Sequence, residues 1–523
     1  MRDGAQLNQG RVISADEQAG PDLGAKIANA DTALGSAAGV IKVARSGQIS
    51  DKVRLSEHHN LVCDDSNVAL TLTSPKAGIV QQSDTAVRGC TMSSTLPDHG
   101  TVIFAQGAAN VQVEGVTFHG GGYHIEYITV SNFIIKNTHH LSVTTPGASP
   151  ISVSMSSHGR IDSPRIDAYT VPPGKSGVRL IGIKKSSFID VINPDLNGVD
   201  ASTVPGCGGV SFSSTTNSTL RGGHISGLKN CDGVLTESEE TAPSSDIEIS
   251  NTVSSGNNAS HGAGHYLNNG EGIDIFNSRR VQLSQVTANG NGTFQGMRQP
   301  GIEISNSIAI TISGCTANNN GGEGIRVDGS PQVTIKGFHT DNNGAAGILV
   351  MPAFGKVSAT HGSPMVKWAP GSANITFSAV WPPQTKIAIA GAQYTVAKFQ
   401  NTGELTLTKG FPGASGTYGY NVDSYVELAD GESLDNGQRH KGEGPNQNAG
   451  EREGIYFSGG LASEVVGRIT GLHVGDTQKQ KTQTYGIRLE NRTRIVASGV
   501  SASGNLVGGV RDSPGRSKIQ TVR

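Results

Sequence analysis

Six charged residues lie close to a repeated four-residue phrase, where they could do acid–base chemistry. Two carboxylates held about 5 Å apart raise the pKa of one and keep the other ionised, an arrangement suited to cleaving a glycosidic bond. A neighbouring arginine can bind a substrate carboxylate through two hydrogen bonds. We therefore predict Asp274, Glu303 and Glu271 as catalytic residues, and Arg326, Glu323 and Asp328 as substrate-binding residues.

The same residues also fit a purely structural interpretation. Asp274, Glu303 and Arg326 would then form a charge ladder on a solvated face, with Arg326 neutralising Glu303. Such a surface pair contributes roughly 0–1 kcal/mol to stability. The geometry of the surrounding surface decides between the two interpretations, because a catalytic site needs an open cleft.

The phrase that positions these residues is Gly-Ile-x-(Ile/Val), which begins at Gly272, Gly301, Gly324 and Gly347. A fixed period between 20 and 30 residues is typical of a solenoid. Within each phrase the two apolar side chains point to one face and the third residue to the other. Stacked coils would bury the apolar ladders and align the third residues in one outward column. The sequence therefore predicts an all-β fold, a right-handed parallel β-helix.

The column continues outside the clearest repeats. Related phrases at Gly177, Gly209 and Gly233 precede them, and the phrase returns at Gly454 and Gly486. The returning phrases place Tyr456 and Arg488 in the column as further substrate-binding candidates.

Asn320 and Asn343 each precede the next signature glycine by four residues and should stack at a sharp corner, where asparagine tolerates the left-handed conformation.

Four domain ranges follow from this pattern. An N-terminal segment with a capping helix is predicted over 1–39, and the β-helix over 40–351. The interruption at 352–450 predicts a small inserted all-β domain and a return segment, followed by the last coils and tail over 451–523. Trp368 and Trp381 lie in the insertion, as its core or as a sugar-stacking platform.

An expanded loop near the column adds two more substrate-binding candidates, His265 and Tyr266. His261 and His265 form a poor metal pair without a third ligand nearby, so we assign no metal. No phosphate-binding loop, zinc motif or serine-hydrolase elbow is present. A calcium site cannot be assigned.

Composition narrows the class of partner. The net charge is −2 over 523 residues and no basic tract occurs, so no nucleic-acid surface is predicted. No apolar run reaches the roughly 20 residues of a membrane span. The first ten residues are polar and do not resemble a signal peptide, which fits numbering that starts after a removed leader. Cys63 with Cys90, and Cys207 with Cys231, are spaced to pair on neighbouring coils or to stay free, whereas Cys315 fits the core.

The repeats over Gly272–Val350 resemble the β-helix repeats of pectate lyases, polygalacturonases, mannuronan epimerases and phage tailspikes. The resemblance covers roughly 40–350 and 451–515, and the segment from Asp22 is similar to the N-terminal helix of such chains. It implies a polysaccharide or oligosaccharide partner in a groove along the sheet, a monomer or homotrimer, and a secreted, cell-surface or virion-tail location. The catalytic motifs of those families are absent.

Two functions remain open. The first is a glycoside hydrolase or polysaccharide lyase that acts through the column. The second is a non-catalytic adhesin, receptor-binding spike or surface scaffold whose inserted domain is the recognition head.

Overall fold

The structure is a computed structural model that describes residues 10–174, 177–204, 206–238, 242–258, 270–293, 299–369, 380–381, 383–401, 403–440, 452–459, 464–512 and 517–521. The described residues form two compact units, which divide between Cys231 and Asp232. Short parallel strands build both units, and α1 (Leu23–Leu34) is the only α-helix in the described ranges. The predicted all-β class is confirmed.

Helix α1 packs against the first strands of the N-terminal unit, β2 (Gly39–Val43), β3 (Gly47–Ile49) and β4 (Lys52–Leu55). Asp22 caps the helix, because its side chain accepts a hydrogen bond of 2.8 Å from the Ala25 amide. The apolar stripe at positions 23, 27, 30 and 34 is buried, as its spacing predicts. Gly47 approaches so closely that a Cβ at this position would lie 2.8 Å from the Leu23 Cβ.

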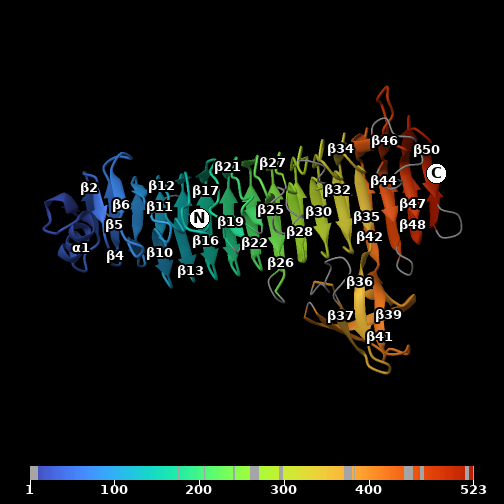
Figure 1. Cartoon of the computed structure of the whole chain (residues 1–523), viewed down its shortest axis with the longest axis horizontal. Helices are drawn as coiled ribbons and strands as arrows, with labels where there is room; N and C mark the ends of the chain where they lie inside the picture. The colour runs from blue at the N-terminus through green and yellow to red at the C-terminus, as the bar shows by residue number, and fades with distance from the viewer. Residues whose placement is uncertain are drawn as a thin grey trace. The chain divides into compact units, whose positions relative to one another are not determined.

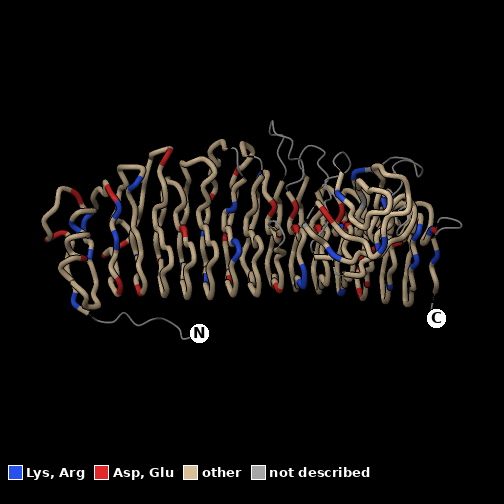
Figure 2. Tube along the Cα trace, turned by 90° about the horizontal axis from the view of Figure 1, so that it is seen from below, with Lys and Arg blue, Asp and Glu red and all other residues tan. Residues whose placement is uncertain are grey.

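The N-terminal unit is a stack of coils whose successive strands pair in parallel (Figure 1). One of its sheets runs in the order β4, β7 (Gly78–Gln81), β10 (Ile103–Gln106), β13 (Ile125–Ile128), β16 (Ile151–Ser154), β19 (Val178–Lys184) and β22 (Cys207–Ser213). Figure 2 shows acidic and basic residues interspersed along the described part of the chain.

The C-terminal unit continues the same construction with two long parallel sheets. We call the first the column sheet: β25 (Cys231–Glu237), β28 (Ile273–Phe276), β30 (Ile302–Ser305), β32 (Ile325–Asp328), β35 (Ile348–Met351), β44 (Glu453–Ser458), β47 (Tyr485–Glu490) and β50 (Gly508–Asp512). We call the second the junction sheet: β26 (Ser244–Ser250), β29 (Ser278–Ser284), β31 (Ile310–Ser313), β33 (Val333–Lys336), β42 (Ser424–Ala429), β45 (Val465–Thr470), β48 (Thr493–Ser498) and β51 (Ser517–Thr521).

The apolar ladders of the repeat fill the interior of this unit. Ile273 pairs with Ile302, which pairs with Ile325, and the register continues from Ile348 to Ile455 across the whole insertion. All these side chains are fully buried, as is the second ladder of Ile275, Ile304, Val327 and Val350. The repeat thus predicts both the fold and the vertical register of its coils.

Buried asparagines stack at one corner of the coils. The backbone amide of Asn320 donates to Oδ1 of Asn343, and the backbone amide of Asn343 donates to Oδ1 of Asn436, at 3.0 and 3.2 Å. The predicted ladder therefore forms, but the left-handed residue at each corner is the preceding one, with φ of 57° at Asn319 and 53° at Asn342. The stacked asparagines serve as hydrogen-bond donors and acceptors rather than as the turn residues themselves.

The cysteines occupy neighbouring coils. Cys63 bonds to Cys90 and Cys207 to Cys231, with Cα–Cα distances of 5.1 and 4.2 Å. Cys315 is a free, buried thiol, as its place in an apolar column predicts. These findings resolve the pairing that the sequence leaves open.

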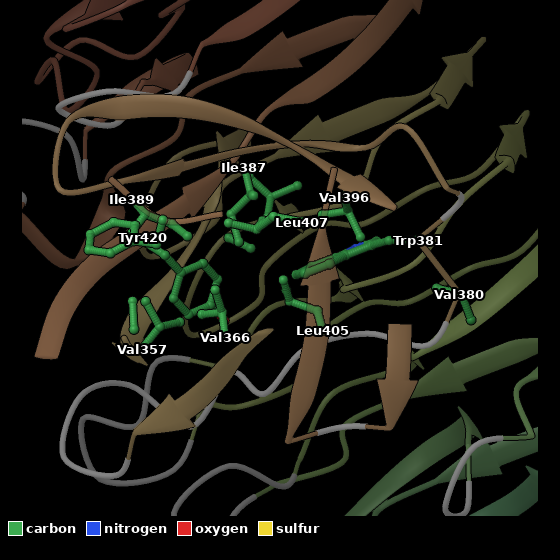
Figure 3. Close-up of a cluster of buried hydrophobic side chains, with 14 residues drawn as sticks. Val357, Val366, Val380, Trp381, Ile387, Ile389, Val396, Leu405, Leu407 and Tyr420 are labelled. Carbon is green, nitrogen blue, oxygen red and sulfur yellow. The ribbon is translucent and has the colours of Figure 1, made fainter. Parts of the chain in front are cut away.

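A closed antiparallel barrel interrupts the C-terminal unit. Its strands follow the order β36 (Ala353–Ala359), β37 (Met365–Ala369), β40 (Glu404–Leu407), β39 (Ala392–Asn401), β38 (Lys386–Ile389) and β41 (Gly416–Val422). Trp381 is buried among the apolar side chains of its core (Figure 3), and Trp368 packs partly buried against them. The Trp381 indole donates to the Gly329 carbonyl of a solenoid turn at 3.1 Å. The tryptophans therefore serve as core.

Solenoid pairing resumes within the range that the sequence assigns to the insertion and return segment. Strand β42 pairs in parallel with β33, so that Val426 lies beside Val333. The next strand, β43 (Glu432–Leu434), pairs with β34 (His339–Asp341). A complete turn of the solenoid therefore precedes Gly454, and the sequence pattern does not reveal this turn because its residues are largely polar.

No helix in the described part of the chain is long and apolar enough to cross a membrane.

Candidate active site

The predicted column forms on the outward face of the column sheet. Asp274 lies beside Glu303 on the next strand, and Glu303 lies beside Arg326. Beyond the nearly buried Leu349, the register continues through Tyr456, Arg488 and Arg511. Adjacent strands are about 4.8 Å apart, so the carboxylates of Asp274 and Glu303 project from neighbouring rungs. Both side chains are half-buried.

A buried carboxyl pair lies at the start of this column. Glu271 is 2% exposed and Asp232 is 4% exposed. Burial raises the pKa of Glu271 well above its ordinary value, and the charge of Asp232 and a hydrogen bond to its side chain raise it further. Asp232 Oδ1 also accepts a hydrogen bond of 2.8 Å from the Gly270 amide, which favours charge on Asp232. Burial and the charge of Asp232 thus favour the protonated form of Glu271.

Glu271 has an unsatisfied oxygen inside this site. Its Oε2 is buried and has no hydrogen-bond partner among the described residues. An unpaired buried oxygen is costly unless its carboxyl group is protonated. This agrees with the raised pKa, to which the nearby Glu303 and Asp274 also contribute.

Glu303 and Arg326 do not pair directly in the way that the charge-ladder interpretation requires. Ser305 Oγ donates to Glu303 Oε1 at 2.9 Å. Arg326 Nε instead donates to Asp328 Oδ2 at 2.7 Å. Burial opposes the charge on Arg326, but Asp328, Glu303 and Glu323 together raise its pKa. Arg326 is 31% exposed, whereas its partner Asp328 is 4% exposed.

Burial also affects the two carboxyl groups beside Arg326, those of Asp328 and Glu323. Burial raises the pKa of Asp328 to about 6, against the opposing effect of Arg326. Burial also raises the pKa of Glu323, while the charges of Arg326 and Arg439 lower it. The nearby arginines therefore favour the ionised form of these two carboxyl groups, against the effect of burial.

Tyr456 and Arg488 satisfy one another and their neighbours. The Tyr456 hydroxyl donates to Glu490 Oε2 at 2.5 Å, and the Arg488 guanidinium lies 5.6 Å from the Tyr456 ring centre. Arg488 is 6% exposed and pairs with the fully buried Glu453 at 3.2 Å and with Glu490. The two residues are in register with the catalytic candidates, but the Tyr456 hydroxyl and both terminal nitrogens of Arg488 are already bound within the protein.

Sequence reasoning missed Asp232 and Glu453, although a signal exists. Both directly precede a signature glycine, as do Glu271 and Glu323. Four of the signature glycines in the C-terminal unit thus follow an acidic residue, of which Asp232, Glu271 and Glu453 are buried and Glu323 is half-buried, whereas Pro300 and Ala346 precede Gly301 and Gly347. The candidates His265 and Tyr266 lie outside the described residues. Within the described ranges, no group of three or more His, Cys, Asp or Glu side chains has the geometry to hold a metal ion.

Comparison with known proteins identifies the architecture. Residues 265–361 match the family model described as the right-handed beta helix region. The chain contains a right-handed parallel β-helix. No curated protein matches the sequence.

Solved β-helix structures resemble the chain at low identity. The Dettilon tailspike protein is 13% identical, with 79% of this chain and 94% of that chain covered and a TM-score of 0.48. The A-module of mannuronan C-5 epimerase AlgE4 from Azotobacter vinelandii is 10% identical, with coverage of 97% and 99% and a TM-score of 0.37. PfbA, a surface adhesin of Streptococcus pneumoniae, is 12% identical, with coverage of 76% and 98% and a TM-score of 0.45.

Proposed function

We propose that the protein is an enzyme that cleaves a polysaccharide on the outward face of the column sheet. The register of Asp274 and Glu303 on adjacent strands, beside the buried Glu271 whose pKa is raised, is the observation that carries this function. Hydrolysis of a glycosidic bond needs one carboxyl group that gives a proton and one that stays ionised. Carboxyl groups about 5–5.5 Å apart suit the retaining reaction, and neighbouring rungs provide a similar spacing.

In this proposal the roles follow from burial. The raised pKa of Glu271 favours its protonated form, so that Glu271 serves as the source of a proton for the site. Asp274 and Glu303 are half-buried and project outward, so they act on the sugar as the acid/base and nucleophile pair. Arg326, Glu323 and Asp328 set the charge beside them, and Arg326 remains exposed enough to donate hydrogen bonds to the substrate.

The disulfides suit an extracellular or surface location for such an enzyme. The chain carries two disulfides between neighbouring coils. Structural disulfides persist in oxidising environments and are rare in the cytosol. We propose that the protein acts outside the reducing cytosol, where polysaccharides are accessible.

The test is a polysaccharide panel assayed in two ways. A reducing-sugar assay detects hydrolysis, and ultraviolet absorbance detects the unsaturated ends that a lyase makes. We expect new reducing ends without absorbance, and a loss of about 100-fold or more in kcat for Asp274→Asn and for Glu303→Gln. Glu427→Gln is the matched control, since Glu427 is half-buried and points outward on the junction sheet.

The outcomes separate the hypotheses. Full activity in Asp274→Asn and Glu303→Gln would remove these residues from the reaction. Products with unsaturated ends would show that the enzyme is a lyase, which cleaves by β-elimination rather than by hydrolysis. Wild-type protein that binds a polysaccharide but cleaves none of the panel would favour the second candidate, a non-catalytic binding protein.

That second candidate has its own supporting observation. Arg326 pairs with Asp328, and Arg488 pairs with Glu453 and Glu490, so much of the charge in the column is satisfied internally. A scaffold keeps its surface charges paired in this way. Asp274→Asn would then change neither binding nor stability, whereas the enzyme loses turnover.

A further inference from the structure

We propose that a pocket between the barrel and the junction sheet is a saccharide-binding subsite, separate from the column. The pocket has a volume of about 650 Å³, within the usual range for small-molecule sites. Barrel residues 383–386 line one side, and solenoid residues, among them Gln332 and Tyr425, line the other. Pockets at the boundary between two domains are common ligand sites.

An exposed aromatic ring provides the main apolar contact. Tyr425 on β42 is 43% exposed and lines the pocket. Its neighbour in register on β45 is Val466, which also lines the pocket. A tyrosine ring presents an apolar face and a polar hydroxyl, which suits the C–H face and the hydroxyl groups of a pyranose ring.

Two glutamines provide hydrogen-bonding groups without charge. Gln332 and Gln384 line the pocket and are exposed. Their backbone groups are bonded within the protein, but neither side-chain amide makes a hydrogen bond among the described residues, and neither does the Tyr425 hydroxyl. Each amide offers both donors and an acceptor. These groups are therefore available to a neutral polar ligand.

The walls of the pocket are held rigidly. Trp381 anchors the barrel through its bond to the Gly329 carbonyl, and Ile308 of the solenoid packs against the barrel core. Asp423, at the exit of the barrel, accepts hydrogen bonds from the Glu464 amide at 2.9 Å and from Gln393 Nε2 at 3.2 Å. A preformed site binds with less loss of conformational entropy.

A second hollow extends the site along the junction sheet. It has a volume of about 300 Å³ and is lined by Gln282, Thr311 and Ala309, next to the Ile308 that lines the first pocket. Its Arg280 and Asp246 bind each other through two hydrogen bonds of 2.6 and 2.7 Å, so their charges are paired. The first pocket is also lined by Lys386 and Asp423, whose formal charges balance, and the second hollow by Glu248, which disfavours an anionic ligand. With the open amides and one tyrosine, this lining favours a neutral or N-acetylated oligosaccharide over an anionic one.

This inference takes its ligand class from the proposed function, but its test is independent of cleavage. Binding is measured by titration calorimetry on full-length Glu303→Gln protein, with malto-, cello-, xylo- and chitohexaose and an oligogalacturonate of equal length as probes. We expect at least one neutral or N-acetylated hexasaccharide to bind. Tyr425→Ala should lower its affinity at least tenfold, and Tyr425→Phe should retain most of it.

Phe188→Ala is the matched control, because Phe188 is 47% exposed and lies in the other compact unit. The Phe188→Ala variant should bind the hexasaccharide with the same affinity as the Glu303→Gln protein. Thermal unfolding of each variant verifies that it is folded. Equal affinity in Tyr425→Ala, exclusive binding of the oligogalacturonate, or no binding of any hexasaccharide would overturn the subsite. If the wild-type protein cleaves a polysaccharide but Tyr425→Ala leaves the binding affinity unchanged, the proposed function stands and this inference is rejected.

Discussion

The column and the junction pocket differ in whether their polar side chains are paired within the protein. In the column, Arg326 pairs with Asp328, and Arg488 pairs with Glu453 and Glu490. In the pocket, the amides of Gln332 and Gln384 have no partner among the described residues. The column is charged and largely satisfied internally, whereas the pocket has only the balancing charges of Lys386 and Asp423 and amides that are open to a ligand.

The difference follows from how each region is built. A strict repeat brings like positions together at about 4.8 Å, so charged residues at one position must find partners on adjacent rungs or protonate. Burial is the main cause of the raised pKa of Glu271 and of Asp328, and the charges of nearby carboxylates, among them Glu303, add to it. The inserted barrel breaks the repeat, so its side chains meet the junction sheet without that vertical register. We infer that the repeat concentrates charge for chemistry and the insertion provides recognition.

The largest expected effect concerns the buried end of the column. Arg488→Ala should destabilise the C-terminal unit by about 3–5 kcal/mol, because it removes one partner of a buried ion pair, the 3.2 Å contact between Arg488 and Glu453. Urea unfolding followed by tryptophan fluorescence measures the change, and hydrogen exchange of β44 and β47 locates it.

The matched control is Arg494→Ala. Arg494 is 65% exposed and pairs with the 42% exposed Glu464 at 2.6 Å, so its loss should cost about 0–1 kcal/mol. Equal effects of the two substitutions would contradict the distinction between a buried and a solvated pair.

A second prediction uses pH to test the cost of charge in the column. The pKa of Asp328 in the folded protein is about 6, above its ordinary value of 3.8. Its stabilising effect is therefore complete below about pH 4 and is lost as the pH rises through 6. Between pH 4.5 and 7.5 the wild-type protein should lose on the order of 2–3 kcal/mol of unfolding free energy relative to Asp328→Asn.

Asp246→Asn provides the control for this pH series. Hydrogen bonds from Arg280 lower the pKa of Asp246, which therefore stays ionised throughout the range. Its contribution is lost only as the pH falls through that lowered pKa, so its substitution should leave the slope unchanged. A wild-type slope that persists in Asp328→Asn would assign the titration to Glu271 or Glu323 instead.

The sequence predicts the column well because one periodic signal determines it. The phrase at Gly347 and the phrase at Gly454 are separated by the insertion, and yet Leu349 lies beside Tyr456 as their spacing to the glycine requires. Burial, however, depends on the side chains that surround a rung, so the sequence does not reveal that Arg488 is enclosed. The junction pocket has no periodic signal, because its residues come from the barrel and from several coils.

The polar coil that precedes Gly454 shows where a signal was present but weak. Asn319-Asn320-Gly321 and Asn342-Asn343-Gly344 mark the corner of two coils, and Asp435-Asn436-Gly437 has the same form. Asp435 has a φ of 52° and Asn436 joins the asparagine ladder. A search for this corner phrase would have placed the coil within the solenoid.

The smallest expected effect concerns the open amides of the pocket. Gln384 has a left-handed backbone with φ of 75°, a conformation that asparagine tolerates. Gln384→Asn therefore keeps the backbone and withdraws the amide by one carbon. We expect the affinity for the bound hexasaccharide to fall about 3- to 10-fold, the value of one hydrogen bond, with unchanged thermal unfolding. Gln400→Asn, at an exposed barrel position outside the pocket, should have no effect. If both substitutions lower the affinity equally, the amide at 384 has no specific role, and the pocket then resembles the rest of the barrel surface.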